Sequence, residues 1–352
     1  MSVDAAQASR AILDGESFLA EEIVRLQYER QPGLAERFGR IGHEKTLEDT
    51  RYSLKYLVES VSLQSPLLFS SYMTWLRVLL IQYKVSTEDL YINMLCLQNV
   101  LGKHLAKRDY ELVSPYIDAA LRQLDTDAEL TDSHLDSSAA ADEARAYLSM
   151  LLQGDRSGAS RLIMGLVDGG MPLQTIYLEI FQKSQYEIGR LWQLGRLTVA
   201  QEHYCSAATQ LIMSQLFPYL FHHSRKGKKL VAACVGGELH EIGLRMVTDI
   251  FELNGWDTYY VGANMPIGPL IRSLKEYGAD VLAISCTMTY HVGLVKELIA
   301  EVRRDPECDG IRILVGGFPF NIDPELWEKV GADGYGRDAE ESVLKAGELT
   351  KR

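Results

Sequence analysis

After residue 228, short β-rich runs alternate with helical stretches, and this alternation limits the fold more than any other feature of the sequence. The β-rich runs cover residues 229–235, 257–263, 280–287, 311–317 and 332–336. The segments between and after them have the apolar spacing of helices. Strands that alternate with helices form a parallel sheet covered on both faces, and right-handed crossovers make it doubly wound. We therefore expect a flavodoxin-like α/β domain with five strands over residues 226–352.

The chain before residue 226 shows helical patterns only. Apolar residues recur at helical spacing through residues 1–125, which predicts an all-helical N-terminal domain. Residues 126–141 are rich in acidic side chains and contain no Lys or Arg, which indicates a solvated connector. Residues 142–225 contain several helical stretches joined by short turns, and this is typical of a small helical bundle.

The composition excludes several classes of protein. With 36 Lys and Arg against 48 Asp and Glu, the formal charge of −12 argues against broad nucleic-acid binding. No apolar run approaches the roughly 18 residues of a membrane span, and the N-terminus lacks the pattern of a signal peptide. The five cysteines are scattered without a CxxC pair, which suggests reduced thiols. We expect a cytoplasmic protein that binds neither membranes nor DNA.

The loop after the first strand is the first candidate for a binding site, because ligands of open α/β sheets lie outside the carboxyl ends of the strands. It lacks both G-x-G-x-x-G and G-x-x-x-x-G-K-[ST], so it predicts neither a dinucleotide site nor a phosphate-cradling loop. It does place His240 between Glu238 and Gly243. A His whose second nitrogen is held by a carboxylate is the usual arrangement of a metal ligand. Taken alone, the loop still favours an ordinary solvent-exposed His.

Two further motifs fall on the same edge of the predicted sheet, since Ser285 and Thr287 end the third strand and a double glycine ends the fourth. Together with ExHxxG, this series resembles the cobalamin-binding domain over residues 226–352. The resemblance implies that His240 replaces the cofactor's own dimethylbenzimidazole as the lower axial cobalt ligand. It also implies that hydroxyls and glycines line a slot for the nucleotide tail. The implied cobalamin-binding residues are Glu238, Leu239, Glu241, Ile242, Gly243, Gly262, Asn264, Ser285, Thr287, Gly316 and Gly317.

Trp192 precedes the pair Glu202-His203 by ten residues in the second helical region. This W-x9-EH spacing resembles the helical cap of cobalamin-dependent photoreceptors, where it faces the upper side of the corrin. The resemblance implies that Trp192, Glu202 and His203 shelter the adenosyl group of adenosylcobalamin. Those photoreceptors often carry a His directly after the Trp, whereas this chain has Gln193, so no cobalt ligand is available at that position. Without the sheet motifs, a core Trp and a buried Glu-His pair would explain the same residues.

Residues 1–125 show no basic recognition helix and resemble the globin- or phycobiliprotein-like domain of photocobilins, which join a cobalamin module to a bilin module. The resemblance implies that this domain binds biliverdin. Because no Cys lies on the helix of Asp49, we expect binding without a covalent bond, and a thioether would have to use Cys96. A bilin needs acceptors for its pyrrole N–H groups, cations for its propionates and aromatic walls. The residues expected to supply them are Asp49, Tyr52, Ser53 and Tyr56, then Arg51, Lys55 and Arg77, and finally Tyr72 and Trp75. A haem-binding domain that uses His43 or His104 is the alternative, and any one of these aromatic residues is explained equally well as core.

These patterns predict a light-sensing signalling protein, not an enzyme, that binds adenosylcobalamin and biliverdin. Its output would pass through a homo-oligomer or an unidentified signalling partner, because no output domain is visible. The alternatives are a corrinoid carrier protein for methyl transfer, which uses the same bundle and sheet, or a haem/cobalamin sensor. A mutase subunit is disfavoured because the chain shows no substrate barrel. The Trp-Glu-His spacing and the long first domain favour the sensor, since a carrier needs neither.

Overall fold

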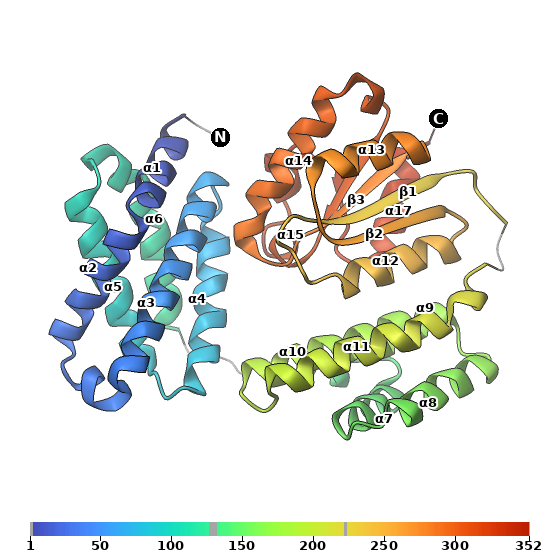
Figure 1. Cartoon of the computed structure of the whole chain (residues 1–352), viewed down its shortest axis with the longest axis horizontal. Helices are drawn as coiled ribbons and strands as arrows, with labels where there is room; N and C mark the ends of the chain where they lie inside the picture. Colours follow the sequence, from blue (N-terminus) through green and yellow to red (C-terminus); the bar gives the residue numbers. More distant parts are fainter. Residues whose placement is uncertain (1–2, 127–131, 222–223, 352) are drawn as a thin grey trace. The chain divides into compact units, whose positions relative to one another are not determined.

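The computed structural model describes residues 3–126, 132–221 and 224–351 (Figure 1). The chain divides into two compact units. The first consists of residues 1–128, 286–300 and 317–332, and the second of residues 129–285, 301–316 and 333–352. Among the described residues, no helix has both the length and the apolar character that a membrane crossing requires.

The first unit begins with a series of long helices, which confirms the predicted helical N-terminal region. These are α1 (Val3–Asp14), α2 (Glu16–Arg30), α3 (Gly33–Ser62), α4 (Pro66–Ile81), α5 (Thr87–His104) and α6 (Lys107–Leu124). The long α3 bends at Gly39, where φ of 60° and ψ of −160° leave the helical region. A capping box between Ser86 and Asp89 starts α5. The later segments of this unit add η4 (Thr289–His291), the start of α14 (Val292–Arg304), α15 (Phe318–Ile322) and α16 (Leu326–Val330).

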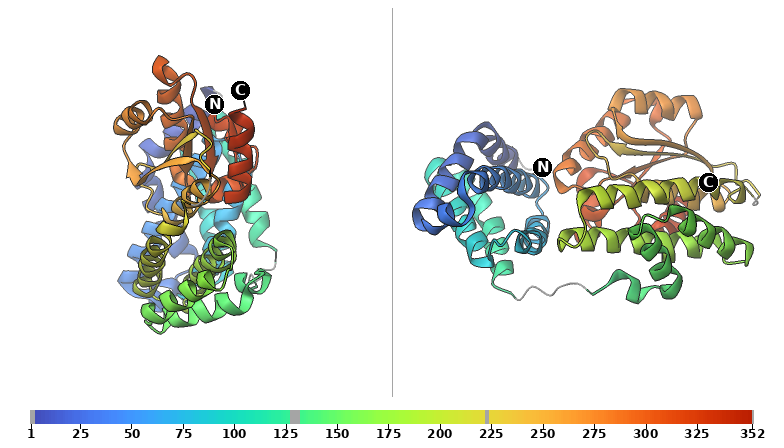
Figure 2. Two further views of the ribbon diagram at one scale, coloured as in Figure 1. Left: turned by 90° about the vertical axis from the view of Figure 1, so that its right-hand side faces the viewer. Right: turned by 60° about the horizontal axis from the view of Figure 1, so that its bottom comes forward.

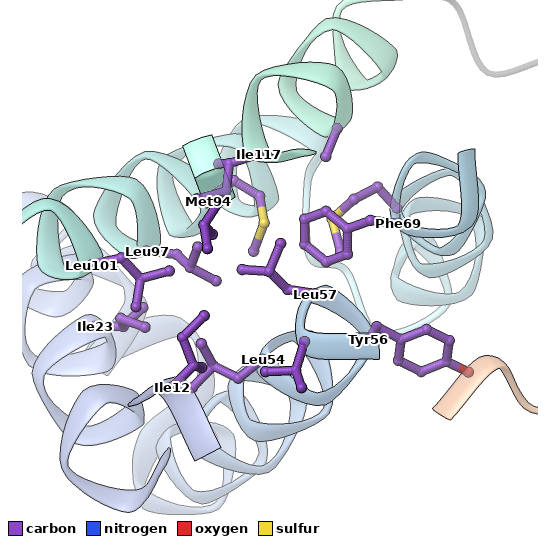
Figure 3. Packing of buried hydrophobic residues seen from close by; sticks show 14 of the residues in the cluster. Ile12, Ile23, Leu54, Tyr56, Leu57, Phe69, Met94, Leu97, Leu101 and Ile117 are labelled. Carbon is purple, nitrogen blue, oxygen red and sulfur yellow. The ribbon is translucent and has the colours of Figure 1, made fainter. Parts of the chain in front are cut away.

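The core of the N-terminal helices is a continuous apolar cluster to which every one of α1 to α6 contributes. Ile12, Leu57, Phe69, Leu97 and Ile117 are fully buried and lie toward one another (Figure 3). Each comes from the apolar stripe of its own helix, so burial of these stripes holds the helices together. The globin- or phycobiliprotein-like topology expected for this region stays a prediction.

The second unit contains a five-stranded sheet, the only sheet in the described part of the chain, with the order β2-β1-β3-β4-β5 and every neighbouring pair parallel. Its strands are β1 (Lys229–Val235), β2 (Asp257–Met265), β3 (Val281–Ser285), β4 (Arg312–Gly316) and β5 (Gly334–Tyr335). This order is the doubly wound, flavodoxin-like arrangement, in which the strand order reverses between β1 and β3. The α/β fold predicted from the alternation of strands and helices is therefore confirmed.

Helices cover both faces of this sheet. α12 (Ile242–Leu253) and α17 (Ala339–Leu349) pack on one face and α13 (Ile267–Tyr277) on the other (Figure 1). The side chains of β1 alternate between the two faces, and Leu230, Ala232 and Cys234 join the core beneath α12 and α17. The three central strands β1, β3 and β4 are almost wholly apolar because both of their faces are buried.

A helical bundle precedes the sheet in the second unit. It comprises α7 (Ala141–Leu152), α8 (Arg156–Asp168), α9 (Leu173–Thr175), the π-helix η2 (Ile176–Gln182), α10 (Lys183–Gln193), α11 (Val199–Gln215) and the short η3 (Phe217–Tyr219). Helices α10 and α11 (yellow-green) run side by side in both orientations (Figures 1 and 2). The bundle core continues into Met246 and Ile250 of α12, so bundle and sheet share buried apolar surface. We call this bundle the cap.

The connector expected over residues 126–141 is described only in part, because residues 127–131 lie outside the described residues. Residues His134–Ser137 form the short helix η1. Leu135 is buried in the core of the cap, and the backbone N–H of His134 donates a 3.0 Å hydrogen bond to Glu187. This part of the acidic segment is therefore packed on the cap and not solvated along its length.

Candidate functional site

The loop between β1 and α12 holds His240 by a buried carboxylate. Glu238 is fully buried, and its Oε1 accepts the backbone N–H of His240 at 3.1 Å and lies 2.5 Å from the Nδ1 of the same residue. The His240 side chain is 58% exposed, so Nε2 is the ring nitrogen left for a ligand. The hydrogen bond with Glu238 raises the pKa of His240 against the opposing effect of burial, and the charges of Glu238 and Glu202 add to it.

The carboxyl end of β2 fixes both ends of this loop. Asn264 donates its backbone N–H to the carbonyl of Glu238 at 3.0 Å, and its side-chain Oδ1 accepts the N–H of Gly237 at 2.7 Å. Its φ of +51° is a left-handed conformation that Asn tolerates better than most residues. Asn264, expected to contact the cofactor, thus positions the loop itself.

Glu241 is also held by β2. Its Oε2 accepts the hydroxyl of Tyr260 at 2.9 Å and the backbone N–H of Ala263 at 3.1 Å. The pairing of β1 with β2 shifts register at two places near this end, and such bulges re-aim the backbone. Gly262 lies within this stretch with φ of +87°, where a Cβ would also approach Glu241. Neither Tyr260 nor Ala263 was predicted, because a Tyr or Ala in a strand gives no signal of this role.

Ser285 and Gly316 lie where the sheet motifs predicted. Ser285 pairs in register with Cys234 on one side and with Gly316 on the other, so the three residues form a row at the carboxyl edge. A Cβ on Gly316 would lie 3.1 Å from the carbonyl oxygen of Gly336, so this position has little room for a side chain. These residues and the His240 loop thus belong to the same edge of one parallel sheet.

Thr287 and Gly317 follow β3 and β4 in the chain and belong to the first unit. Gly317 has φ of +106°, and a Cβ there would lie 1.9 Å from the carbonyl oxygen of Cys286. Only glycine fits this conformation and this close approach. The loop residue Leu239 is 71% exposed, and Ile242, which starts α12, packs on the core of the cap beside Gly243.

Three side-chain contacts show what the polar residues of α11 bind. Helix α11 carries the pair Glu202-His203, in which the two side chains contact each other and the His is 75% exposed. The second oxygen of Glu202 accepts the hydroxyl of Ser206 at 2.9 Å. One further contact was missed from the sequence, since Gln210 of α11 donates to Oε1 of Glu241 at 3.3 Å. Trp192 is half-buried near the end of α10.

The aromatic residues predicted to enclose a bilin pack on one another instead of facing a vacant slot. Tyr56 and Tyr72 stack with ring centroids 3.7 Å apart, and Trp75 lies beyond Tyr72 at 6.3 Å. Ser53 shares a 3.2 Å hydrogen bond with the Tyr72 hydroxyl. Burial raises the pKa of Asp49 to about 6. A spacing of 3.7 Å leaves no room for a flat ligand between the two Tyr rings.

Arg77 and Lys55, two of the three cations predicted for the bilin propionates, already have partners. Arg77 is buried and donates to the carbonyls of Leu124 and Thr126 at 3.3 and 2.6 Å, which satisfies the end of α6. Lys55 lies 4.0 Å from Glu16. These contacts are those of a packed helical core, and bilin binding stays a prediction.

The other residues suggested for this region occupy ordinary positions. Tyr52 is 42% exposed, and Arg51 is half-buried on the same helix. The alternative haem ligands His43 and His104 each make an edge-on ring contact, with Tyr28 and Phe18 respectively. No group of three or more His, Cys, Asp or Glu side chains suited to a metal occurs within residues 3–126, 132–221 and 224–351. Haem binding likewise stays a prediction.

Two family models for cobalamin-binding domains match this chain. Residues 228–344 match the family model of a B12 binding domain, and residues 143–216 match a second B12 binding domain model. The chain is 30% identical to the dimethylamine corrinoid protein of Methanosarcina barkeri over 169 residues, which cover 46% of this chain and 76% of that protein. It is 28% identical to dimethylamine corrinoid protein 1 of Methanosarcina acetivorans over the same length and the same shares of the two chains.

A solved structure shows the same fold. The Methanosarcina barkeri monomethylamine corrinoid protein aligns with a TM-score of 0.52 at 20% identity and covers 59% of this chain and 99% of its own. The light-sensing function predicted from the W-x9-EH spacing is wrong, because these relatives are corrinoid proteins named for methylamines. Cobalamin binding was the correct part of the prediction. The chain belongs to the family of corrinoid proteins that includes the dimethylamine corrinoid protein of Methanosarcina barkeri.

Proposed function

We propose that this protein is a corrinoid carrier for methyl transfer, the alternative that the sequence left open. The observation that supports corrinoid binding most directly is the His240–Glu238 contact at the carboxyl edge of the sheet, with Glu238 fully buried and His240 exposed. The relatives named as dimethylamine corrinoid proteins favour methyl transfer as the use of that corrinoid. When bound, a corrinoid supplies a cobalt that accepts and releases a methyl group. The protein's own task is to bind that group, orient it and exclude water from it.

The residues at this edge fit a corrinoid. His240 offers Nε2 as the lower ligand, and Glu238 fixes the ring and raises its basicity through Nδ1. Gly316 and Gly317 let two backbone segments approach closely at this edge, since a Cβ would lie 3.1 Å from the carbonyl oxygen of Gly336 and 1.9 Å from that of Cys286. Ser285 and Thr287 would supply hydroxyl groups for the nucleotide tail.

Trp192, Glu202 and His203 would lie over the upper face of the corrin. Glu202 lies on the same face of α11 as Gln210, which donates a hydrogen bond to Glu241 of the His240 loop, and this supports a location on the same site. We propose that these residues shelter a methyl group in place of the adenosyl group expected from the sequence. A small ligand needs less cover than adenosyl does, so an exposed His203 is compatible with it.

The partner of such a carrier is a methyltransferase. Because the relatives that support the assignment are named for dimethylamine and monomethylamine, we propose a methylated amine as the source of the methyl group. The carrier itself performs no catalysis in this proposal, and neither light nor a bilin takes part.

The lower-ligand assignment is tested on protein reconstituted with hydroxocobalamin. In protein that contains ¹⁵N-labelled histidine, the nitrogen splitting in the electron paramagnetic resonance spectrum of reduced, Co(II) protein should change from three lines to two, and His240→Ala should lose this two-line splitting. The variant should also retain at least about tenfold less cobalamin on dialysis. His203→Ala is the matched control, because it removes an exposed His of the cap and should keep the splitting. An unchanged spectrum for His240→Ala would refute the assignment.

The carrier role is tested by adding a methylamine-specific methyltransferase and dimethylamine to the reduced, reconstituted protein. The visible spectrum of the bound corrinoid should change only when the amine and the methyltransferase are both present. A change that requires illumination instead would contradict the proposal. No change with mono-, di- or trimethylamine would exclude methylated amines as the substrate class.

A further inference from the structure

The loop that carries His240 is tied at both ends to β2. At its start, Asn264 binds the backbone of Gly237 and Glu238. At its end, Glu241 is bound by Tyr260 and by the N–H of Ala263. Since His240 lies between these two attachments, its position depends on whether both of them hold.

Glu241 forms the attachment at the end of the loop. Its carboxylate receives three donors from two other elements: the Tyr260 hydroxyl at 2.9 Å, the Ala263 N–H at 3.1 Å and the Gln210 amide at 3.3 Å. Hydrogen bonds to an ionised acceptor are roughly twice as strong as neutral ones, so together they define the carboxylate's orientation. The Glu241 side chain therefore binds other residues of the protein. The sequence analysis had predicted instead that it contacts the cofactor.

Gln210 differs from the other two donors because it comes from the cap. Glu202, Ser206 and Gln210 follow one another at intervals of four residues and therefore lie along one face of α11. One end of this face carries Glu202, which is proposed to lie over the upper face of the corrin, and the other end carries Gln210, which contacts Glu241. A rigid helix thus links the upper-face residues to the loop that presents the lower ligand.

We propose that Gln210 and Tyr260 are positioning residues that hold Glu241 and thereby fix His240 for axial ligation. Through Gln210, the strength of that ligation depends on where α11 lies. This inference rests on the proposed function, because it takes His240 as the cobalt ligand.

The test measures how readily cyanide displaces the lower ligand in protein reconstituted with hydroxocobalamin. Gln210→Met and Tyr260→Phe each remove one donor and keep most of the side-chain volume. Each should lower the cyanide concentration for half conversion to the dicyano spectrum by about tenfold, the effect of one lost charge-assisted hydrogen bond. The double variant should show less than the product of the two effects, because both residues act through Glu241.

Ser214→Ala is the matched control. Ser214 lies four residues beyond Gln210 on α11 and accepts a 2.9 Å hydrogen bond from Arg245 of α12, so it also joins the cap to the α/β domain. Its contact does not involve the His240 loop, and its loss should leave the cyanide titration at the wild-type value. An effect of Ser214→Ala equal to that of Gln210→Met would mean that any loosened cap contact suffices, and would overturn the proposal.

A second variant keeps the test decisive if Gln210→Met fails to fold. Gln210→Glu preserves the size and helix propensity of the side chain and places a second carboxylate against Glu241, so it should weaken ligation more than Gln210→Met does. In cofactor-free protein, both variants should also speed hydrogen exchange at the loop amides of residues 236–243 without lowering the melting temperature.

The possible failures are distinguishable. If wild type and His240→Ala require the same cyanide concentration, His240 is not the ligand and the proposed site itself is wrong. If those two differ while Gln210→Met, Tyr260→Phe and Gln210→Glu all match wild type, the site stands and the positioning role is wrong.

Discussion

The N-terminal helices and the cap are both wholly helical, yet their polar and aromatic residues make different kinds of contact. In the N-terminal helices, Tyr56 and Tyr72 stack on each other and Arg77 satisfies backbone carbonyls. In the cap, Gln210 donates a hydrogen bond to Glu241 in the loop that carries His240. Residue type and helical spacing are similar in the two regions. What differs is the presence of a parallel sheet edge toward which the side chains are directed.

A cavity in the core of the N-terminal helices should lower stability without affecting the corrinoid site. Phe69→Ala removes a fully buried ring and should destabilise that region by about 3–5 kcal/mol, while bound cobalamin keeps its spectrum. Urea unfolding followed by circular dichroism measures the stability. Phe217→Ala is the control, because this ring is 59% exposed and its loss should cost within about 0.5 kcal/mol. A changed cobalamin spectrum in Phe69→Ala would show that the N-terminal core does contribute to the corrinoid site.

Arg77→Met distinguishes a structural role of Arg77 from a role in binding a bilin. If Arg77 serves the carbonyls of Leu124 and Thr126, its loss should cost about 2 kcal/mol of stability, since these are hydrogen bonds from a charged donor. If it serves a bilin propionate, the variant should instead lose a red absorption band in protein produced with biliverdin and keep its stability. The surface variant Arg108→Met should alter neither quantity, because its ion pair with Asp4 is exposed.

On the side of the sheet, Glu238→Gln tests the buried carboxylate behind His240. The amide keeps the volume but loses the charge that fixes the ring, so cobalamin affinity should fall about 10- to 100-fold, or about 1.4–2.8 kcal/mol. Equilibrium dialysis of hydroxocobalamin measures it. Glu340→Gln, an exposed carboxylate on α17, should keep wild-type affinity. Equal affinity for Glu238→Gln and wild type would show that the contact does not support ligation.

The sheet edge was predictable because parallel strands end together. Once the alternation of strands and helices was recognised, His240, Ser285 and Gly316 had to fall on one edge. Tyr260 and Gln210 were not predictable, because the partner of a Tyr on a strand or a Gln on a helix depends on tertiary placement. No local pattern carries that information.

The error in function arose from the cap. A Trp followed by a Glu-His pair is compatible with any helical bundle over a corrinoid, so its spacing did not separate a photoreceptor from a carrier. The photocobilin resemblance of residues 1–125 rested on aromatic and charged residues at helical spacing. The packed core made by Tyr56, Tyr72 and Arg77 needs the same residues at the same spacing.

The smallest expected effect concerns the junction of the cap with α12, where Tyr177 of the π-helix donates a 2.8 Å hydrogen bond to Asp249. Burial raises the pKa of Asp249 to about 6, and nearby Glu252 adds to the rise, while the Tyr177 hydroxyl and Arg245 oppose it. The pKa of an Asp in the unfolded chain is about 3.9. Between these values the folded protein binds more protons than the unfolded one, so the free energy of unfolding falls as the pH rises through this window.

Asp249→Asn removes this dependence, because the amide oxygen still accepts from Tyr177 and carries no charge. Between pH 5 and 7.5, wild type should lose about 1 kcal/mol more stability than the variant. Asp49 and Glu59 also have raised pKa values, of about 6 and about 7, but they titrate alike in both proteins. The difference between the two urea-unfolding series therefore isolates Asp249. Asp309→Asn, at an exposed position, should follow wild type. Parallel curves for wild type and Asp249→Asn would mean that the junction stays hydrated and that the cap does not seal this face of α12.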